Sequence, residues 1–193
     1  MYPVMPTNVE IKAVLVDRSA VEAIVARLCD SGPEVIQQED TFFACKGGRL
    51  KLRILAPDRG ELIRYERSDV AEVRESHYSI ARTSDPLILL NILTSALGKT
   101  GVVRKTRTLY MIGQTRIHLD SVKGLGDYLE LEVVLRPGQS RIEGKAIADQ
   151  LLAQFGIEER HLLAEAYVDL LARLAGSETS QLRGVDGGNK LAS

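Results

Sequence analysis

Tyr128-Leu129-Glu130-Leu131-Glu132-Val133 alternates polar or charged residues with leucine and valine. Successive side chains of a β-strand point to opposite faces of a sheet. The stretch therefore predicts a strand with Glu130 and Glu132 on one face and aliphatic side chains on the other. Two acids that share one inward face need a cation or a basic partner, so this strand directs attention to charge.

The same period-two alternation occurs in segments throughout the preceding chain. Turn sequences such as Pro57-Asp58-Arg59-Gly60 and the single Gly113 separate neighbouring segments, as is typical of antiparallel strands. The predicted strands are 8–17, 35–44, 49–56, 61–67, 75–82, 102–112, 114–123 and 128–136.

Helix signals interrupt this series. Ser19 is a good N-cap for a helix that Gly32-Pro33 would stop, Asp85 can cap a second helix, and Ser140 can open a third. The predicted helices are 19–28, 86–97, 140–156 and one or two within 158–174. Eight strands with few long crossovers predict an α+β fold, a closed eight-stranded antiparallel β-barrel with helices packed outside.

Charged residues of the other predicted strands also share one face. An antiparallel sheet often exposes one face to water, and such charges are then merely solvated. Two observations weaken that interpretation here: the charged faces hold few Ser, Thr, Asn or Gln residues, and basic and acidic residues are sorted by strand. The residues in question are Asn8, Glu10, Lys12, Arg49, Lys51, Arg53, Lys105, Arg107, Arg116, His118 and Asp120.

If the sheet closes, its charged face lines the interior. Confined arginine and lysine side chains require an anion, and phosphate suits the planar fork of arginine. Confined carboxylates require cations, and their hard oxygen atoms favour Mg²⁺ or Mn²⁺. A phosphorylated ligand bound together with a divalent metal satisfies both sets.

Composition supports a single domain of ordinary size. The 193 residues are 45% hydrophobic and 26% charged, with a formal net charge of -1, so no global charge attracts nucleic acid or membranes. Cys29 and Cys45 form no CxxC pair, which argues against a disulfide framework or a cysteine zinc site. We expect residues 1–175 to form the domain and the Gly/Ser/Asp-rich residues 176–193 to form a disordered tail.

Residues 1–7 lack the basic-then-apolar pattern of a signal peptide, and no apolar run approaches the roughly 20 residues that span a bilayer. These features predict a cytoplasmic location and no membrane partner.

The charged strands also carry a family signature. Asn8-Val9-Glu10-Ile11-Lys12 resembles the N-terminal E-x-E-x-K motif of the CYTH superfamily, the triphosphate tunnel metalloenzymes, which includes class IV adenylyl cyclases and thiamine triphosphatases. The likeness runs in order from about residue 8 to 172. It continues through Arg49-Leu50-Lys51-Leu52-Arg53, Val103-Arg104-Lys105-Thr106-Arg107, Arg116-Ile117-His118-Leu119-Asp120 and Gly124-Leu125-Gly126-Asp127-Tyr128-Leu129-Glu130-Leu131-Glu132.

The resemblance implies an eight-stranded tunnel that binds triphosphates with Mg²⁺ or Mn²⁺. The metal ligands that it implies are Glu10, Asp120, Glu130 and Glu132. The phosphate-binding residues that it implies are Lys12, Lys51, Arg53, Lys105 and Arg107, with Arg116 and His118 also facing the interior. The catalytic residues that it implies are Lys12, Arg53, Lys105 and Arg107. His118 could be a general base or contact the base of a nucleotide, but a lone strand histidine is more often simply hydrogen-bonded.

The sequence departs from the family pattern at two positions. Asn8 replaces the first glutamate of E-x-E-x-K, and an amide oxygen can bind a metal but brings no charge. Glu66 stands about where cyclising members carry a lysine. Both changes argue against adenylyl cyclase activity while leaving the basic residues intact.

Three hypotheses about function follow. The first is a metal-dependent enzyme that hydrolyses or cyclises a nucleoside triphosphate, thiamine triphosphate or inorganic triphosphate. The second is a module that binds a nucleotide or polyphosphate without turnover. The third is a repurposed cyclase that acts on a phosphorylated biosynthetic intermediate. A homodimer is compatible with all three, and none involves nucleic acid.

Overall fold

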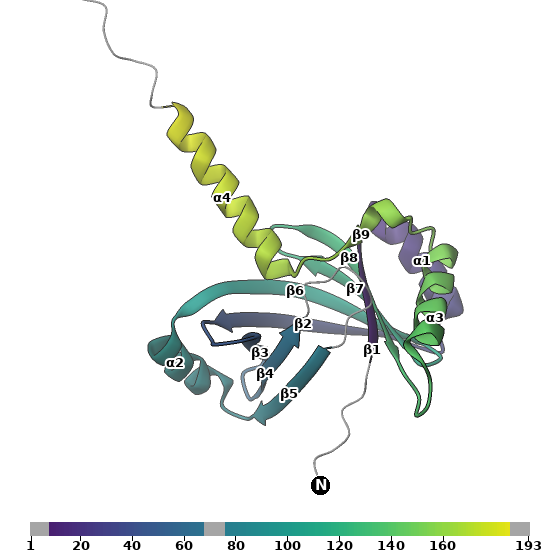
Figure 1. The fold of residues 1–193 in the computed structure, drawn as a ribbon, viewed down its shortest axis with the longest axis horizontal. Helices are drawn as coiled ribbons and strands as arrows, with labels where there is room; N and C mark the ends of the chain where they lie inside the picture. Colours follow the sequence, from purple (N-terminus) through teal and green to yellow (C-terminus); the bar gives the residue numbers. More distant parts are fainter. Residues whose placement is uncertain (1–7, 68–75, 186–193) are drawn as a thin grey trace, which may run out of the picture.

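The computed structural model describes residues 8–67 and 76–185, with side chains placed for residues 8–65 and 79–177. One antiparallel sheet dominates it, in the order β5-β4-β3-β2-β6-β7-β8-β1-β9 (Figure 1). This confirms the predicted α+β class and the antiparallel pairing. The strands are β1 (Asn8–Val14), β2 (Ser31–Phe43), β3 (Arg49–Ala56), β4 (Arg59–Arg67), β5 (Ser76–Thr83), β6 (Lys99–Ile112), β7 (Thr115–Val122), β8 (Gly126–Val134) and β9 (Leu162–Leu163).

The prediction of a closed eight-stranded barrel is wrong. The sheet has nine strands and two edges, because the two-residue β9 pairs with the free edge of β1 at Lys12 and Ala13. Within the described residues, β5 pairs only with β4, so nothing joins the two edges by backbone hydrogen bonds. The sheet is instead strongly curved, and side chains from β1 and β5 still line one shared cavity.

Helices cover the aliphatic face of the sheet, as the alternation predicted. The helices α1 (Arg18–Leu28) and α3 (Arg141–Gln154) lie to the right of β1 in Figure 1; α1 packs on β6 and β7, and α3 packs on β1 and β8. Their apolar stripes bury the outward residues of these strands in one core, since apolar area removed from water stabilises the fold. Gly144 permits the close approach of α3, because a Cβ atom there would lie 2.8 Å from Val9. This core includes Val9, Val25, Ile117, Leu119, Leu129, Leu131, Val133 and Ala148.

Two of the predicted helix boundaries differ in the structure. The Asp17 side chain, and not that of Ser19, caps α1 by accepting a hydrogen bond from the backbone N–H of Ala20. Gly32-Pro33 lies inside β2 and does not follow the helix directly. Ser140 caps α3 as predicted, in a reciprocal capping box with Glu143. The helix α2 (Pro86–Leu97) follows the predicted cap Asp85, whose side chain makes no capping hydrogen bond.

The last part of the described chain, residues 159–185, returns across the charged face of the sheet. The short helix η1 (Glu159–His161) leads into β9, and α4 (Tyr167–Val185) then starts against β6 and projects away from the sheet (Figure 1). Gly101 makes room for α4, because a Cβ atom there would lie 2.4 Å from Val168. Helix α4 continues past residue 175, where the sequence predicted the end of the domain and the start of a disordered tail. The boundary and the tail stay predictions.

Within residues 8–67 and 76–185, no helix combines the length and the apolarity that crossing a bilayer requires.

Candidate functional site

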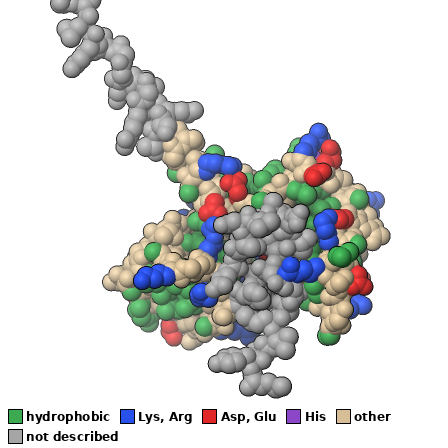
Figure 2. Space-filling model, viewed as in Figure 1, with side chains coloured by type: hydrophobic (Ala, Val, Ile, Leu, Met, Phe, Trp, Pro, Cys, Tyr) green, Lys and Arg blue, Asp and Glu red, His purple; other side chains and the backbone are tan. Residues whose placement is uncertain are grey.

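The charged face of the sheet encloses a cavity of about 290 Å³. Six basic and four acidic side chains of the described residues line it, together with the start of α4. Figure 2 shows lysine and arginine side chains on both sides of the middle of the molecule, several beside acidic ones. The basic side chains are Lys12, Lys51, Arg53, Lys105, Arg107 and Arg116, and the acidic ones are Glu10, Asp40, Glu130 and Glu132.

One side of the cavity, the basic wall, consists of Asp40 from β2 with Lys51 and Arg53 from β3. Asp40 and Arg53 are direct neighbours in the β2–β3 register. The Asp40 carboxylate accepts hydrogen bonds from Lys51 Nζ at 2.6 Å and from Arg53 Nε at 3.0 Å. Glu61 is a more distant second partner of Arg53, at 3.9 Å. The three side chains of the wall itself, two cations and one carboxylate, carry a net positive charge.

Burial and ion pairing shift the pKa values of this wall. Burial raises the pKa of Asp40, but Lys51 and Arg53 lower it more, so that it lies well below its ordinary range. Burial lowers the pKa of Lys51 to about 8, although Asp40 partly offsets the shift. Lys51 is therefore charged at neutral pH but loses its proton far more readily than a surface lysine.

The floor of the cavity consists of Lys105 and Arg107 from β6 above Asp120 from β7. Asp120 is completely buried and accepts hydrogen bonds from Lys105 Nζ at 2.7 Å and from Arg107 Nε at 2.6 Å. Arg107 Nη2 donates another, at 2.6 Å, and the Tyr167 hydroxyl donates a fourth, at 3.1 Å. Arg107 also pairs with Glu130. Asp120 thus orients the two cations from below and is not part of the cavity lining.

The opposite side, the acidic wall, consists of Glu10 from β1, His118 from β7, and Glu130 and Glu132 from β8. The register places Glu10 opposite Glu132 and His118 opposite Glu130. Lys12 Nζ lies 3.1 Å from Glu130, and Arg116 donates to Glu132 at 3.3 Å near the rim. Carboxylates from neighbouring strands thus converge on this side.

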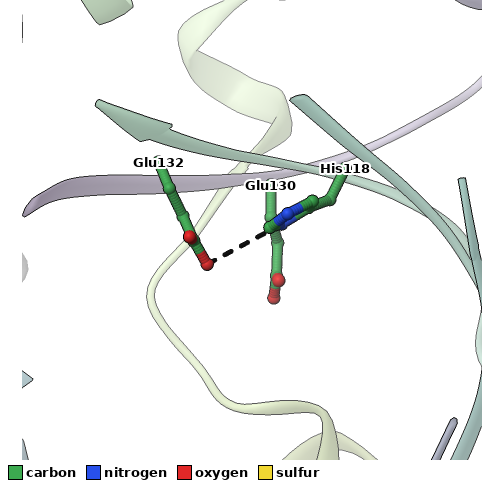
Figure 3. Close-up of side chains that lie close together, drawn as sticks. All are labelled: His118, Glu130 and Glu132. Atoms are coloured by element: carbon green, nitrogen blue, oxygen red, sulfur yellow. Dashed lines mark ion pairs between the residues drawn. The ribbon is translucent and has the colours of Figure 1, made fainter. Parts of the chain in front are cut away.

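His118 is 4% exposed, and its ring reaches from β7 toward Glu130 and Glu132 of β8 (Figure 3). Burial, with the nearby Arg107, lowers the pKa of His118 to about 4 despite the attraction of Glu132. The imidazole is therefore neutral at pH 7, with a lone pair on one ring nitrogen. Suitable ligand atoms of His118, Glu130 and Glu132 all lie within 4.8 Å of one another.

The structure thus brings together most of the residues predicted for the site. The predicted residues that line the cavity are Glu10, Lys12, Lys51, Arg53, Lys105, Arg107, Arg116, Glu130 and Glu132. His118 and Asp120 lie immediately behind them. The side chain of Glu66, the predicted departure on β4, lies outside the described residues.

The sequence prediction missed two residues. Asp40 lies in the polar run Gln37-Gln38-Glu39-Asp40, where no apolar residue marks the period-two alternation of the strand. One signal was present, because Asp40 is two residues before Phe42 and therefore shares a face of the strand with that buried side chain. Tyr167 lies over Lys12, with its ring 4.0 Å from Nζ, and over Lys105 at 5.0 Å. Nothing in the local sequence indicated that the start of α4 would cover the floor.

Comparison with known proteins agrees with this geometry. The sequence profile of the CYTH domain matches residues 6–167. The chain belongs to the CYTH family. Among curated proteins, none matches the sequence significantly.

Solved structures share the fold of this CYTH chain at low sequence identity. The PH1012 protein from Pyrococcus horikoshii superimposes with a TM-score of 0.75 at 20% identity, covering 84% of this chain and 98% of that one. A protein from Vibrio parahaemolyticus described as a "putative adenylate cyclase" gives 0.68 at 18% identity, with 86% and 98% covered. One from Bacillus halodurans with the same description gives 0.55 at 14%, with 84% and 95% covered.

The acidic wall fits the divalent metal that the CYTH family implies. Carboxylate oxygens are hard ligands, and neutral imidazole is a common metal ligand. Two buried atoms on this side, Asn8 Oδ1 and His118 Nδ1, have no hydrogen-bond partner among the described residues. A metal ion or its water ligands would satisfy such atoms. Glu10, Glu130 and Glu132 are the carboxylates positioned to hold it, because they line the cavity, whereas Asp120 lies beneath the floor and does not.

Proposed function

We propose that this CYTH protein is a metal-dependent enzyme that hydrolyses a phosphoanhydride bond of a triphosphate inside the charged cavity. One observation carries the proposal: six basic side chains from β1, β3, β6 and β7 converge on one cavity, and three of its four acidic side chains gather on a single wall of it. A chain of three phosphates needs several cationic contacts in a row, and its metal needs carboxylates beside them.

Phosphate binding falls to the basic wall and the floor. Arg53 and Arg107 present planar guanidinium groups, which suit the two-oxygen geometry of a phosphate. Lys51, Lys105 and Lys12 add compact charges around them. In the absence of ligand these cations pair with Asp40, Asp120 and Glu130, which keeps the side chains ordered for an incoming anion.

The bound divalent cation would neutralise phosphate charge and activate the attacking water. Water attacks the terminal phosphorus, the bond to the bridging oxygen breaks, and negative charge grows on the diphosphate that leaves. The cations of the basic wall and the floor then stabilise that charge.

The size of the cavity favours hydrolysis over cyclisation. Small-molecule sites usually measure about 300–1,000 Å³, and the 290 Å³ of this cavity lie at the lower end. A triphosphate chain fits such a volume more readily than a whole folded nucleotide. Cyclisation needs the ribose held in the site with its 3′-hydroxyl aligned to the α-phosphorus.

A second candidate is binding without turnover. Asn8 brings no charge where the family motif has a glutamate, so the acidic wall has one carboxylate fewer than that motif would supply. A site with weakened metal affinity would still hold an anion through its six basic side chains. The two candidates differ in whether product forms.

The test is incubation with tripolyphosphate, thiamine triphosphate and ATP, with Mg²⁺ or Mn²⁺, and separation of phosphate, pyrophosphate and cyclic nucleotide. We expect release of phosphate that depends on metal and is lost in Arg53→Gln. The matched control is Lys145→Gln, which removes an exposed cation that pairs only with Asp149 in the next turn of α3. Ligand-induced thermal stabilisation without product would favour the binding module, and no stabilisation by any triphosphate would overturn both candidates.

A further inference from the structure

His118 has a ring nitrogen that lacks a partner where one is expected. The side chain is 96% buried on β7, and Nδ1 accepts or donates no hydrogen bond within residues 8–67 and 76–185. The nearest charged group is Glu132, whose Oε1 lies 3.7 Å away, beyond hydrogen-bond distance. Buried polar atoms are nearly always satisfied, so an unsatisfied one beside a cavity points to a missing ligand.

The surroundings of this nitrogen identify the kind of ligand. Glu130 and Glu132 face it from β8, and their carboxylate oxygens can only accept hydrogen bonds when ionised. A group shared by all three must therefore be positive or donate in several directions. The ligand atoms lie within 4.8 Å of one another, and in an octahedral site with bonds of about 2.1 Å neighbouring ligand atoms stand about 3.0 Å apart. The three side chains lie close together (Figure 3), and binding of a cation would require them to turn so that their ligand atoms meet at one centre.

Glu130 can take part although it already has partners. Lys12 lies 3.1 Å from its Oε1, and Arg107 pairs with its Oε2. Each carboxylate oxygen has two lone pairs, so a cation can share the group with these neighbours. Glu132 pairs at the rim with Arg116, whose side chain is 43% exposed.

We propose that Nδ1 of His118 coordinates the divalent cation together with Glu130 and Glu132, and that this nitrogen makes the site prefer Mn²⁺ to Mg²⁺. Mg²⁺ takes oxygen ligands in octahedral geometry and loses its water reluctantly, whereas first-row transition metals accept imidazole readily. The inference deepens the proposed function and rests on it, because it names the metal that the hydrolysis would use.

The experiment is pulsed electron paramagnetic resonance of Mn²⁺ added alone to the full chain. We expect nitrogen coupling to the bound ion, and we expect the coupling to change when histidine is supplied as ¹⁵N-histidine. Because the label alters no side chain, this measurement is independent of folding. Mn²⁺ that binds without histidine coupling, or no Mn²⁺ binding at all, would overturn the inference.

Two variants assign the nitrogen among the three histidines of the chain. In His118→Gln the coupling should vanish, the Mn²⁺ dissociation constant should rise about tenfold or more, and Mg²⁺ affinity, measured by competition, should change less than twofold. The matched control is the double variant His77→Gln/His161→Gln, which should keep the coupling. If His118→Gln does not fold, the double variant decides alone, since His118 is then the only histidine. Coupling that survives in His118→Gln, or is lost from the double variant, would overturn the assignment.

Failure of this inference differs from failure of the proposed function. Hydrolysis of tripolyphosphate with equal efficiency in Mg²⁺ and Mn²⁺, with no histidine coupling, would reject the nitrogen ligand and keep the enzyme. Histidine coupling in a protein that neither binds nor cleaves any triphosphate would keep the metal site and reject the enzyme.

Discussion

Across one cavity, the basic wall places two cations around a single carboxylate, and the acidic wall holds three carboxylates, two of which lie close to a neutral imidazole. Asp40 serves Lys51 and Arg53. On the acidic wall, Lys12 and Arg107 pair with Glu130, and Arg116 pairs with Glu132. The first arrangement leaves positive charge for an anion and the second leaves negative charge for a metal. A protein of nearly zero net charge can therefore bind a metal–phosphate pair through local sorting alone.

The largest effect is expected where the two walls meet, at Arg107. Arg107→Met should lower the free energy of unfolding by about 3–5 kcal/mol, because it leaves Asp120 and Glu130 buried without their guanidinium partner. Urea denaturation measures this. The exposed pair Arg104–Glu39 supplies the control: Arg104→Met should cost less than about 1 kcal/mol.

The double variant Arg107→Met/Asp120→Asn sharpens the test, since removing one of the stranded carboxylates should recover part of the lost stability. If the free energy of unfolding of Arg107→Met lies within about 1 kcal/mol of the wild-type value, the floor is more hydrated than its burial implies.

The next effect separates the two walls by ligand. Glu132→Gln should weaken Mn²⁺ binding about 10- to 100-fold, because it removes one charged ligand from the acidic wall. Binding of metal-free tripolyphosphate should be unchanged or slightly tighter, because the variant removes a negative charge from the cavity. Isothermal titration calorimetry with each ligand separately measures both, and Glu158→Gln, an exposed acid on the chain segment before η1, is the control. Equal losses for both ligands would mean that the walls are not distinct sites.

These distinctions show what the sequence could predict. Period-two alternation on a strand reports which side chains share a face, and it correctly grouped Lys51 with Arg53, and Glu130 with Glu132. It does not report which strands meet at the sheet edges. Closure was therefore predicted from strand number, whereas the structure has β9 occupying the edge of β1.

The residues that sequence analysis missed share a physical cause. Asp40 lies in a polar run with no apolar neighbour at 37 or 39 to mark the alternation, and its role depends on pairing with β3. Tyr167 reaches the floor only because α4 packs on β6 at Gly101. The capping residues Asp17 and Ser19 are both good caps, so composition could not choose between them. Contacts between distant segments decide the roles of Asp40 and Tyr167, whereas the cap of α1 is decided by local backbone geometry.

Asp40→Asn should act in the opposite sense to Glu132→Gln. It frees Lys51 and Arg53 from their counter-ion, so affinity for metal-free tripolyphosphate should rise about five- to tenfold, measured by calorimetry. Stability should fall at neutral pH. Because the folded-state pKa of Asp40 lies below its ordinary value of 3.8, the stabilisation by this ion pair is present above pH 3.8 and is lost as pH falls further. Wild type and variant should therefore converge in stability in acid, and a constant difference down to pH 2 would contradict the ion-pair account.

The smallest effect tests the charge of the basic wall through pH. The pKa of Lys51 is lowered from 10.5 to about 8, so the side chain loses its positive charge as pH rises through that value. Affinity for metal-free tripolyphosphate should then be about fourfold weaker at pH 8.5 than at pH 7, the ratio of the protonated fractions of a group with that pKa. Lys51→Arg provides the matched comparison, because arginine stays charged throughout this range. Each protein is referred to its own affinity at pH 7, so ionisation of the ligand cancels between them. Above pH 8, the affinity of the wild type for tripolyphosphate should fall relative to that of Lys51→Arg. Parallel profiles of affinity against pH for the two proteins would show that Lys51 does not carry the phosphate affinity of this wall.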